Sequence, residues 1–291
     1  MTGNQLTALL ESYRAGDHGR FRSVAIQAIC GLRSEKDKIH AQRILDASVD
    51  NSSSEFMLRT LGSHNSALAS QIPSVSLDQL HLADSIRAEV DMLLLERQRF
   101  TDLLKHNLQP RSRILLHGAP GNGKTSLAAA LANSMKLNGF CMKLSSVRDS
   151  YMGATATKVD HVLKLADGGA LLLLDEFDAI ASTRVGDDDK GIGREHIAIV
   201  ATILQCLDRQ PMGVIVAATN RIDIIDPAVR RRFDVEIELI APSAQAADKF
   251  ADFVFARHEW PRSGWSGFDH GAFYAIERDC VAHIRREVLG V

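Results

Sequence analysis

The stretch "RILLHGAPGNGKTSLAAALANSMKL", residues 113 to 137, joins an apolar run, a glycine-rich turn and a helix-forming run. The turn fits the pattern G-x-x-x-x-G-K-[ST], whose glycines let successive backbone N–H groups turn inward around phosphate oxygens at a helix N-terminus. A glycine turn without a ligand would not need a strand before it and a helix after it. We therefore predict a phosphate-binding loop formed by Gly118, Ala119, Pro120, Gly121, Asn122, Gly123, Lys124, Thr125 and Ser126.

Apolar runs and amphipathic runs alternate along the middle of the chain. The short apolar runs "ALLLLD" and "GVIVAA", residues 170–175 and 213–218, are separated by the helical pattern of residues 194–208. Continuous apolar runs of this length are typical of strands that are buried on both faces, and strands that alternate with helices form parallel sheets. We therefore predict an α/β fold with a parallel sheet.

Two adjacent acids follow the run of four leucines in "ALLLLDEFDAI". Asp175 and Glu176 would lie at the carboxyl end of a buried strand, where α/β sheets hold their ligands. There Asp175, together with the hydroxyl of Thr125, would hold Mg²⁺, and Glu176 would polarise the attacking water. The alternative is that Asp175 caps a helix or belongs to a solvated acidic turn.

Polar residues also follow the next predicted strand. In "GVIVAATN" the strand ends at Thr219 and Asn220, and Asn220 would lie beside the γ-phosphate unless it merely begins a turn. Downstream, "RIDIIDPAVRRRFD" carries three consecutive arginines, residues 230–232. Three arginines do not suit a core, so they form either a solvated helix end or part of a functional site.

The four motifs "GAPGNGKT", "LLLLDEFDAI", "VAATN" and "IDPAVRRRFD", in this order, resemble the P-loop, Walker B, sensor-1 and arginine-finger motifs of the AAA ATPases. The resemblance covers residues 77–239. It implies a P-loop AAA domain with a five-stranded parallel sheet, and a short helical lid. It also implies a ring, usually of six subunits, with ATP and Mg²⁺ at each interface.

The resemblance also implies that arginines of one subunit act in trans on the γ-phosphate bound by the neighbouring subunit. Because an arginine finger accelerates hydrolysis by ~10³ to 10⁵, hydrolysis would depend on assembly. Three contiguous arginines depart from the commonest family spacing. We favour Arg231 and Arg232 over Arg230 as the residues that act with Glu176 and Asn220.

The segment "SYMGAT", residues 150–155, resembles the pore loop of the same family. Tyr151 and Met152 would project into the central channel and grip a polypeptide, since an aromatic ring and a thioether contact varied side chains without requiring hydrogen bonds. Gly153 would let the loop turn. The alternative is that Tyr151 packs against the surface of its own domain.

Composition divides the chain into four parts. Residues 1–58 carry apolar residues at helical spacing and are expected to form a small N-terminal helical domain. Residues 59–76, which contain Ser and Asn, are expected to form a linker. Residues 77–241 would be the nucleotide-binding domain, and the two helical patterns of residues 242–291 the lid.

Bulk properties narrow the classes of function. Lys+Arg 34 against Asp+Glu 36 gives a formal charge of −2, so the chain as a whole has no attraction for nucleic acid or an anionic membrane. The four cysteines form no C-x-x-C pair, which argues against a zinc site. The N-terminus lacks a leader pattern and no run reaches the ~18 apolar residues of a membrane span. We expect a cytoplasmic protein.

These patterns favour an ATP-hydrolysing ring that remodels or unfolds protein substrates through a central pore. The chain has no protease motif, so degradation would need a separate partner. The small N-terminal domain with a short lid resembles bacterial AAA ATPases that accompany a subtilisin-like serine protease, in pairs tied to plasmid maintenance and phage defence. Two other functions stay open: a nucleotide-dependent switch that controls a partner enzyme, and a nucleic-acid motor or loader supported by local basic runs.

Overall fold

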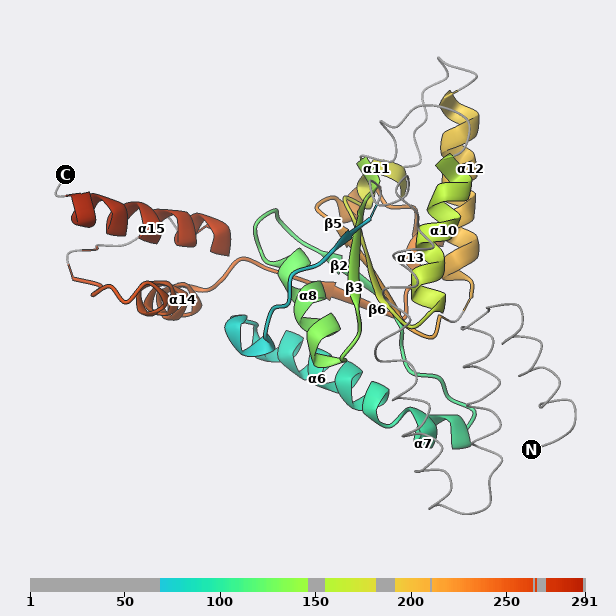
Figure 1. Ribbon diagram of the computed structural model, residues 1–291, viewed down its shortest axis with the longest axis horizontal. Helices are drawn as coiled ribbons and strands as arrows, with labels where there is room; N and C mark the ends of the chain where they lie inside the picture. The colour runs from blue at the N-terminus through green and yellow to red at the C-terminus, as the bar shows by residue number, and fades with distance from the viewer. Residues whose placement is uncertain are drawn as a thin grey trace, which may run out of the picture.

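The computed structural model describes residues 69–145, 155–181, 192–209, 211–263, 265 and 271–289 (Figure 1). The predicted N-terminal helical domain of residues 1–58 and most of the predicted linker lie outside the described residues. The predicted pore-loop residues Tyr151, Met152 and Gly153 also lie outside them.

A sheet of six strands forms the centre of the described chain, in the order β1-β3-β4-β5-β2-β6. The bounds are β1 Ser70–Gln71, β2 Arg113–His117, β3 Gly139–Lys143, β4 Leu171–Asp175, β5 Val214–Thr219 and β6 Val235–Glu238. Each neighbouring pair from β3 to β6 is parallel, and β1 pairs with β3 in the antiparallel direction. The sheet is therefore mixed.

The prediction of a five-stranded, all-parallel sheet is wrong, because β1 adds a sixth, antiparallel strand at one edge. In β1, Ser70 pairs with Cys141 and Gln71 with Phe140, and the N–H of Ile72 donates to the carbonyl of Gly139 at 3.0 Å. Only two residues pair, and they lie in a polar segment without the apolar alternation of a strand. Their pairing is set by the free edge of β3 rather than by their own sequence.

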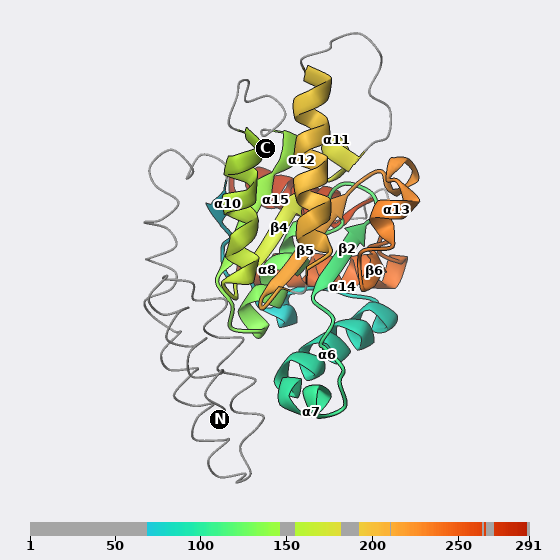
Figure 2. The same cartoon turned by 90° about the vertical axis from the view of Figure 1, so that its right-hand side faces the viewer.

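Helices cover both faces of the sheet (Figures 1 and 2). On one face lie η1 Leu77–Gln79, α6 Asp84–Gln98 and α8 Lys124–Ser134, with α7 Phe100–Lys105 after α6. On the other face lie α10 Thr155–Asp167 and α12 Ile192–Leu207, together with the shorter elements α11 Asp178–Ala181, η2 Ile222–Ile224 and α13 Pro227–Arg230.

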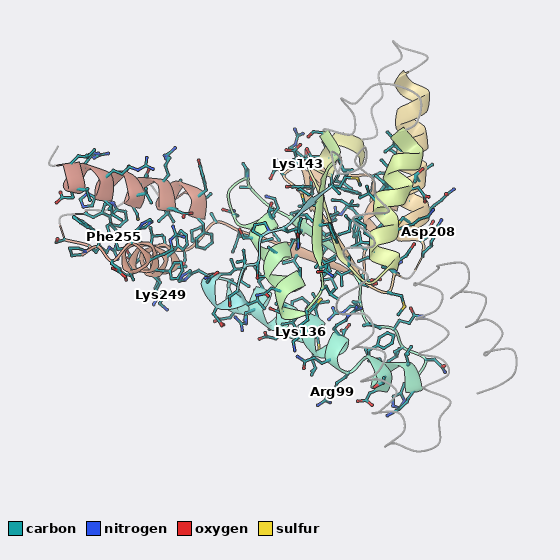
Figure 3. All side chains as sticks on the ribbon, in the orientation of Figure 1. Arg99, Lys136, Lys143, Asp208, Lys249 and Phe255 are labelled. Carbon is teal, nitrogen blue, oxygen red and sulfur yellow. The ribbon has the colours of Figure 1, made fainter. Side chains whose placement is uncertain are left out.

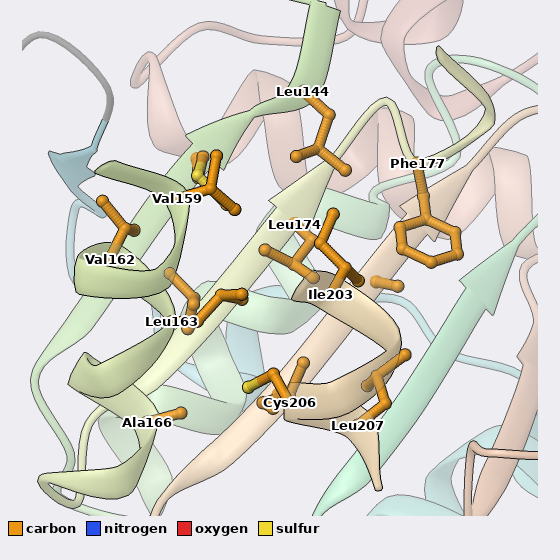
Figure 4. Packing of buried hydrophobic residues seen from close by; sticks show 14 of the residues in the cluster. Leu144, Val159, Val162, Leu163, Ala166, Leu174, Phe177, Ile203, Cys206 and Leu207 are labelled. Carbon is orange, nitrogen blue, oxygen red and sulfur yellow. The ribbon is translucent and has the colours of Figure 1, made fainter. Parts of the chain in front are cut away.

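Alternate residues of the central strands feed the two hydrophobic cores. In β4, Leu172 and Leu174 pack with α10 and α12 (Figure 4), whereas Leu171 and Leu173 pack on the side of α6 and α8. All four side chains are fully buried. The leucine run is therefore explained by a strand with a helical layer on each face.

A carboxylate joins the beginnings of β2 and β6. Asp234 accepts hydrogen bonds from the backbone N–H groups of Ser112 and Arg113, both at 3.0 Å, and from the Arg113 guanidinium at 3.1 and 2.5 Å. Arg113 also donates to the carbonyl of Leu207 at 2.7 Å. Partial burial opposes ionisation of Asp234, but the hydrogen bonds outweigh it and lower the pKa of this carboxyl group.

The C-terminal part folds into α14 Ala244–Arg257 and α15 Phe273–Leu289, called here the helical pair. The pair lies beside the sheet, at the left in Figure 1, and has its own apolar core around Phe255, Ile276 and Cys280. This agrees with the two helical patterns expected in residues 242–291. Among the described residues, no helix has the length and apolarity that crossing a bilayer requires.

Candidate nucleotide site

The predicted phosphate-binding loop connects β2 to α8, and three of its residues adopt positive φ. Gly118 has φ 138°, Gly121 has φ 81° and Gly123 has φ 85°. A Cβ atom on Gly118 would lie 2.2 Å from the carbonyl oxygen of Leu239, so no larger residue fits there. Gly123 is the N-cap of α8, which leaves the first N–H groups of that helix outside its own ladder.

The side chain of Lys124 lies along the loop. Its Nζ donates to the carbonyl oxygens of Gly118 at 2.8 Å and Ala119 at 2.9 Å, and the residue is only 8% exposed. Burial lowers the pKa of this ammonium group, although Asp175 and Asp178 act against the shift. A triphosphate would compete with the loop carbonyls for the same ammonium group.

The two predicted Mg²⁺ ligands meet across the loop. Thr125, in the first turn of α8 with Ser126, donates from its hydroxyl to Oδ2 of Asp175 at 3.4 Å. Asp175 is the last residue of β4, and its Oδ1 accepts the N–H of Glu176 at 3.0 Å. One hydroxyl and one carboxylate fit Mg²⁺, which keeps several waters and takes phosphate oxygens as further ligands.

Glu176 follows β4 with a backbone φ of 56°, in the left-handed region that residues other than glycine rarely adopt. The next N–H, that of Phe177, donates to the carbonyl of Ala218 in β5 at 2.9 Å, and the Phe177 ring is buried. The strand end therefore turns sharply and fixes the direction in which Glu176 leaves the sheet.

A third acid of the "DEFD" stretch, for which no role was predicted from the sequence, joins β4 to β5. Asp178 accepts the hydroxyl hydrogen of Thr219 at 2.7 Å, and the Thr219 oxygen accepts the N–H of Arg221 at 3.0 Å. Asn220 lies between them, directly after β5, with an exposed side chain. Because β4 and β5 are parallel neighbours, Asn220 lies at the same edge of the sheet as Asp175.

The three consecutive arginines, residues 230–232, differ in the contacts that their side chains make. Arg230 pairs with Glu236 at 2.6 Å. Arg232 pairs with Asp208, which follows α12 (Figure 3), at 2.7 Å, and donates to the Ala228 carbonyl at 2.6 Å. Within the part of the chain that the structure describes, the exposed Arg231 has no ion pair or hydrogen bond from its guanidinium. Of the two favoured arginines, Arg231 is thus free to contact another molecule.

The resemblance implied a lid that carries part of the nucleotide pocket, but the individual contacts between the loop and the helical pair were not predicted from the sequence. The N–H of Tyr274 donates to the Gly121 carbonyl at 3.2 Å, and a Cβ on Gly121 would meet the Cβ atoms of Tyr274 and Ala272 at 3.0 and 3.2 Å. The Asn122 amide nitrogen donates to the Leu239 carbonyl at 3.1 Å. The small residues of the "HGAFY" stretch, which includes Ala272, could have indicated a close contact with the loop. Nothing in the sequence around Leu239 indicated its contact.

Comparisons with known proteins point to one family. Residues 114–240 match a model of the AAA family, described as "ATPase family associated with various cellular activities". An AAA family ATPase of Sinorhizobium fredii, y4kL, is 34% identical over 208 residues, which are 68% of this chain and 60% of that protein. A proteasome-activating nucleotidase of Archaeoglobus fulgidus is 36% identical over 182 residues, 59% of this chain and 45% of that protein.

Each of these matches spans less than two thirds of the relative's own length. Among solved structures, the crystal structure of the FIGL-1 AAA domain superposes with a TM-score of 0.56 at 20% identity, covering 70% of this chain and 66% of that chain. At this identity the superposition shows a common fold.

Proposed function

We propose that the protein is a cytoplasmic, ATP-driven ring that remodels or unfolds protein substrates, because residues 114–240 match the AAA family model and a similar protein is named an AAA family ATPase. The observation that carries the proposal is the meeting of Thr125 with Asp175 beside the loop of Lys124. This brings a phosphate-binding loop and a metal-binding carboxylate to one edge of the sheet, in the arrangement that hydrolysis of a nucleoside triphosphate requires.

Each residue of the site takes one role in the proposed reaction. The N–H groups at the start of α8 and the Lys124 ammonium bind the β- and γ-phosphates of ATP. Thr125 and Asp175 hold Mg²⁺, which, when bound, neutralises charge that develops on the transferred phosphoryl group. Glu176 accepts a proton from the attacking water, and Asn220 orients the γ-phosphate from the end of the neighbouring strand.

The remaining group that hydrolysis needs would come from a neighbouring subunit. Arg231 is exposed and has no partner among the described residues, so its guanidinium is available to contact the γ-phosphate of an adjacent copy. Arg232, which the sequence analysis also favoured, is held by Asp208 and would orient α13 instead. We propose a closed ring, of six copies, in which ATP lies at each interface.

Substrate engagement is assigned to Tyr151, Met152 and Gly153, as the pore loop of this ring. The name of the Archaeoglobus relative, a proteasome-activating nucleotidase, links that protein to a proteolytic partner. By analogy we propose that this chain delivers substrates to a separate effector, for which a subtilisin-like serine protease is our candidate. A switch that controls a partner enzyme without threading is the alternative, and Tyr151→Ala would leave its function intact.

The decisive experiment is the mass of the Glu176→Gln protein in solution, measured by light scattering with and without ATP and Mg²⁺. The proposal expects a shift to about six subunits with ATP, since the variant binds the nucleotide but turns it over slowly. Lys124→Ala, which cannot bind ATP, is the matched control and should not shift. A Glu176→Gln protein that stays monomeric at saturating ATP would refute the ring.

A further inference from the structure

Two consecutive residues of the phosphate-binding loop contact the chain that leads into the helical pair. One contacts the first turn of α15, and the other contacts the segment that precedes α14. The Gly121 carbonyl accepts the N–H of Tyr274, in the first turn of α15. The Asn122 side chain reaches the carbonyl of Leu239, which directly follows β6 and precedes the connection into α14. The loop that would bind phosphate is therefore joined both to the chain that leaves the sheet and to the helix that returns to it.

Asn122 makes this contact from a buried position. The residue is 3% exposed, its Nδ2 donates to Leu239 at 3.1 Å, and its Oδ1 is buried without a hydrogen-bond partner among the described residues. Rotating the amide would place Oδ1 against the Leu239 carbonyl, so the orientation is fixed by that acceptor. A buried amide oxygen without a donor costs the fold free energy, which offsets what the hydrogen bond to the Leu239 carbonyl contributes. The net contribution of the side chain to stability is therefore small.

The Leu239 carbonyl lies at the centre of the contact. This carbonyl lies close to Gly118, at the start of the loop. A Cβ atom added to Gly118 would be only 2.2 Å from the carbonyl oxygen. The N–H of Leu239 donates to the carbonyl of His117, the last residue of β2, at 2.7 Å. Leu239 thus contacts the residue immediately before the loop, the first residue of the loop and, through Asn122, its middle. A displacement of the loop must be passed to Leu239, or the hydrogen bond to Asn122 must break.

We propose that Asn122 is a positioning residue that couples the phosphate-binding loop to the placement of the helical pair. Its amide faces Leu239, so it binds no phosphate through its side chain. Instead it holds the loop to the chain segment that carries α14, while Gly121 holds the start of α15. Because coupling between two sites is reciprocal, a nucleotide that orders the loop also orders the helical pair, and a fixed helical pair strengthens nucleotide binding. This inference rests on the proposed nucleotide site.

The test compares Asn122→Ala with Asn133→Ala. Asn133 is the matched control because it lies on α8, the helix that follows the loop, and its Nδ2 also donates to a backbone carbonyl, that of Val75, at 3.1 Å, but on an exposed surface. For both variants and the parent protein, calorimetry measures the affinity for ADP with Mg²⁺. Hydrogen exchange measures how far ADP protects the amides of α14 and α15, and thermal unfolding measures the stability without nucleotide.

For Asn122→Ala we expect three- to tenfold weaker ADP binding and loss of the ADP-dependent protection in the helical pair. Its unfolding temperature without nucleotide should change little, because losing the unpaired Oδ1 offsets losing the donor to the Leu239 carbonyl. Asn133→Ala should bind ADP within twofold of the parent and keep the protection. Asn122→Asp, which keeps the shape but puts an oxygen against Leu239, should weaken binding at least as much as Asn122→Ala and provides a second measurement if the alanine variant does not fold.

Two results would overturn the inference. One is an Asn122→Ala protein with a lower unfolding temperature but parental ADP affinity and protection, which would make the residue merely structural. The other is a variant that matches the parent in all three measurements. Failure of the proposed function looks different, because the parent protein itself would then bind no ADP.

Discussion

Replacing Asp234 by asparagine tests how the sheet is held together at the start of β2 and β6. The change keeps the shape of the side chain but removes the charge and turns one acceptor toward the Arg113 guanidinium into a donor. Two hydrogen bonds join these side chains, at 3.1 and 2.5 Å, and the side chains of Arg113 and Asp234 are 20% and 18% exposed. Because hydrogen bonds to charged groups contribute more than neutral ones but partial exposure reduces them, we expect a loss of about 2–4 kcal/mol in the free energy of unfolding.

The assay is urea unfolding followed by circular dichroism, with Asp223→Asn as the matched control. Asp223 also accepts hydrogen bonds from two nitrogens of an arginine side chain, Nε and Nη2 of Arg221, but these two side chains are 61% and 58% exposed. Solvent screens such a pair, so the control should unfold at the midpoint of the parent protein. If Asp234→Asn unfolds at the midpoint of Asp223→Asn, the reasoning from burial and geometry is refuted.

The same pair predicts a dependence on pH. The pKa of Asp234 is lower in the folded chain than the ordinary aspartate value of about 3.9. Its contribution to stability is therefore complete above that ordinary value and is lost as the pH falls through the lower, folded-state pKa. The difference in stability between the parent and Asp234→Asn should shrink as the pH falls below about 4. A difference that does not change between pH 7 and pH 3 would contradict this assignment.

Three further predictions concern the proposed ATPase. Lys124→Ala should abolish ATP binding in calorimetry, because the ammonium group that meets the phosphates is removed; parental affinity would exclude Lys124 from the site. Glu176→Gln should bind ATP normally but lower kcat ~10²- to 10⁴-fold in a phosphate-release assay, since the base is lost; unchanged turnover would remove Glu176 from the mechanism. Arg231→Ala should lower kcat per subunit ~10³-fold or more without changing ATP affinity. Arg230→Ala, which breaks a pair within the subunit, should lower kcat far less, and equal losses would contradict the choice of Arg231.

Local patterns predicted the central architecture because each strand and helix carries its own signal. Four consecutive leucines before Asp175 required burial on both faces, and the structure places that strand between two helical layers. The glycines of the loop likewise occupy positions with positive φ, which only their residue type makes easy. Contacts that depend on neighbouring residues in the chain were therefore accessible from the sequence.

Contacts between segments that are distant in the chain could not be predicted from the sequence. Nothing in the leucine at position 239 indicates that its carbonyl approaches Gly118 and Asn122, because a backbone acceptor has no signature in the sequence. Asp178 was passed over for the same reason, since its role depends on Thr219 arriving from the next strand. The choice between Arg231 and Arg232 also required the position of Asp208, which is 24 residues from Arg232 along the chain.

The two-residue strand β1 has a consequence for how the protein stays dispersed at high concentration. Ser70 and Gln71 occupy the hydrogen-bonding groups along one edge of the sheet, and an uncovered edge offers a template on which strands of other molecules can add. At the opposite edge, β6 carries the exposed Glu236 and Glu238, and charged side chains on an edge strand discourage such addition. A shortened chain that began at Leu77 would keep the charged edge but lose β1, and we expect it to aggregate more readily, through the edge of β3.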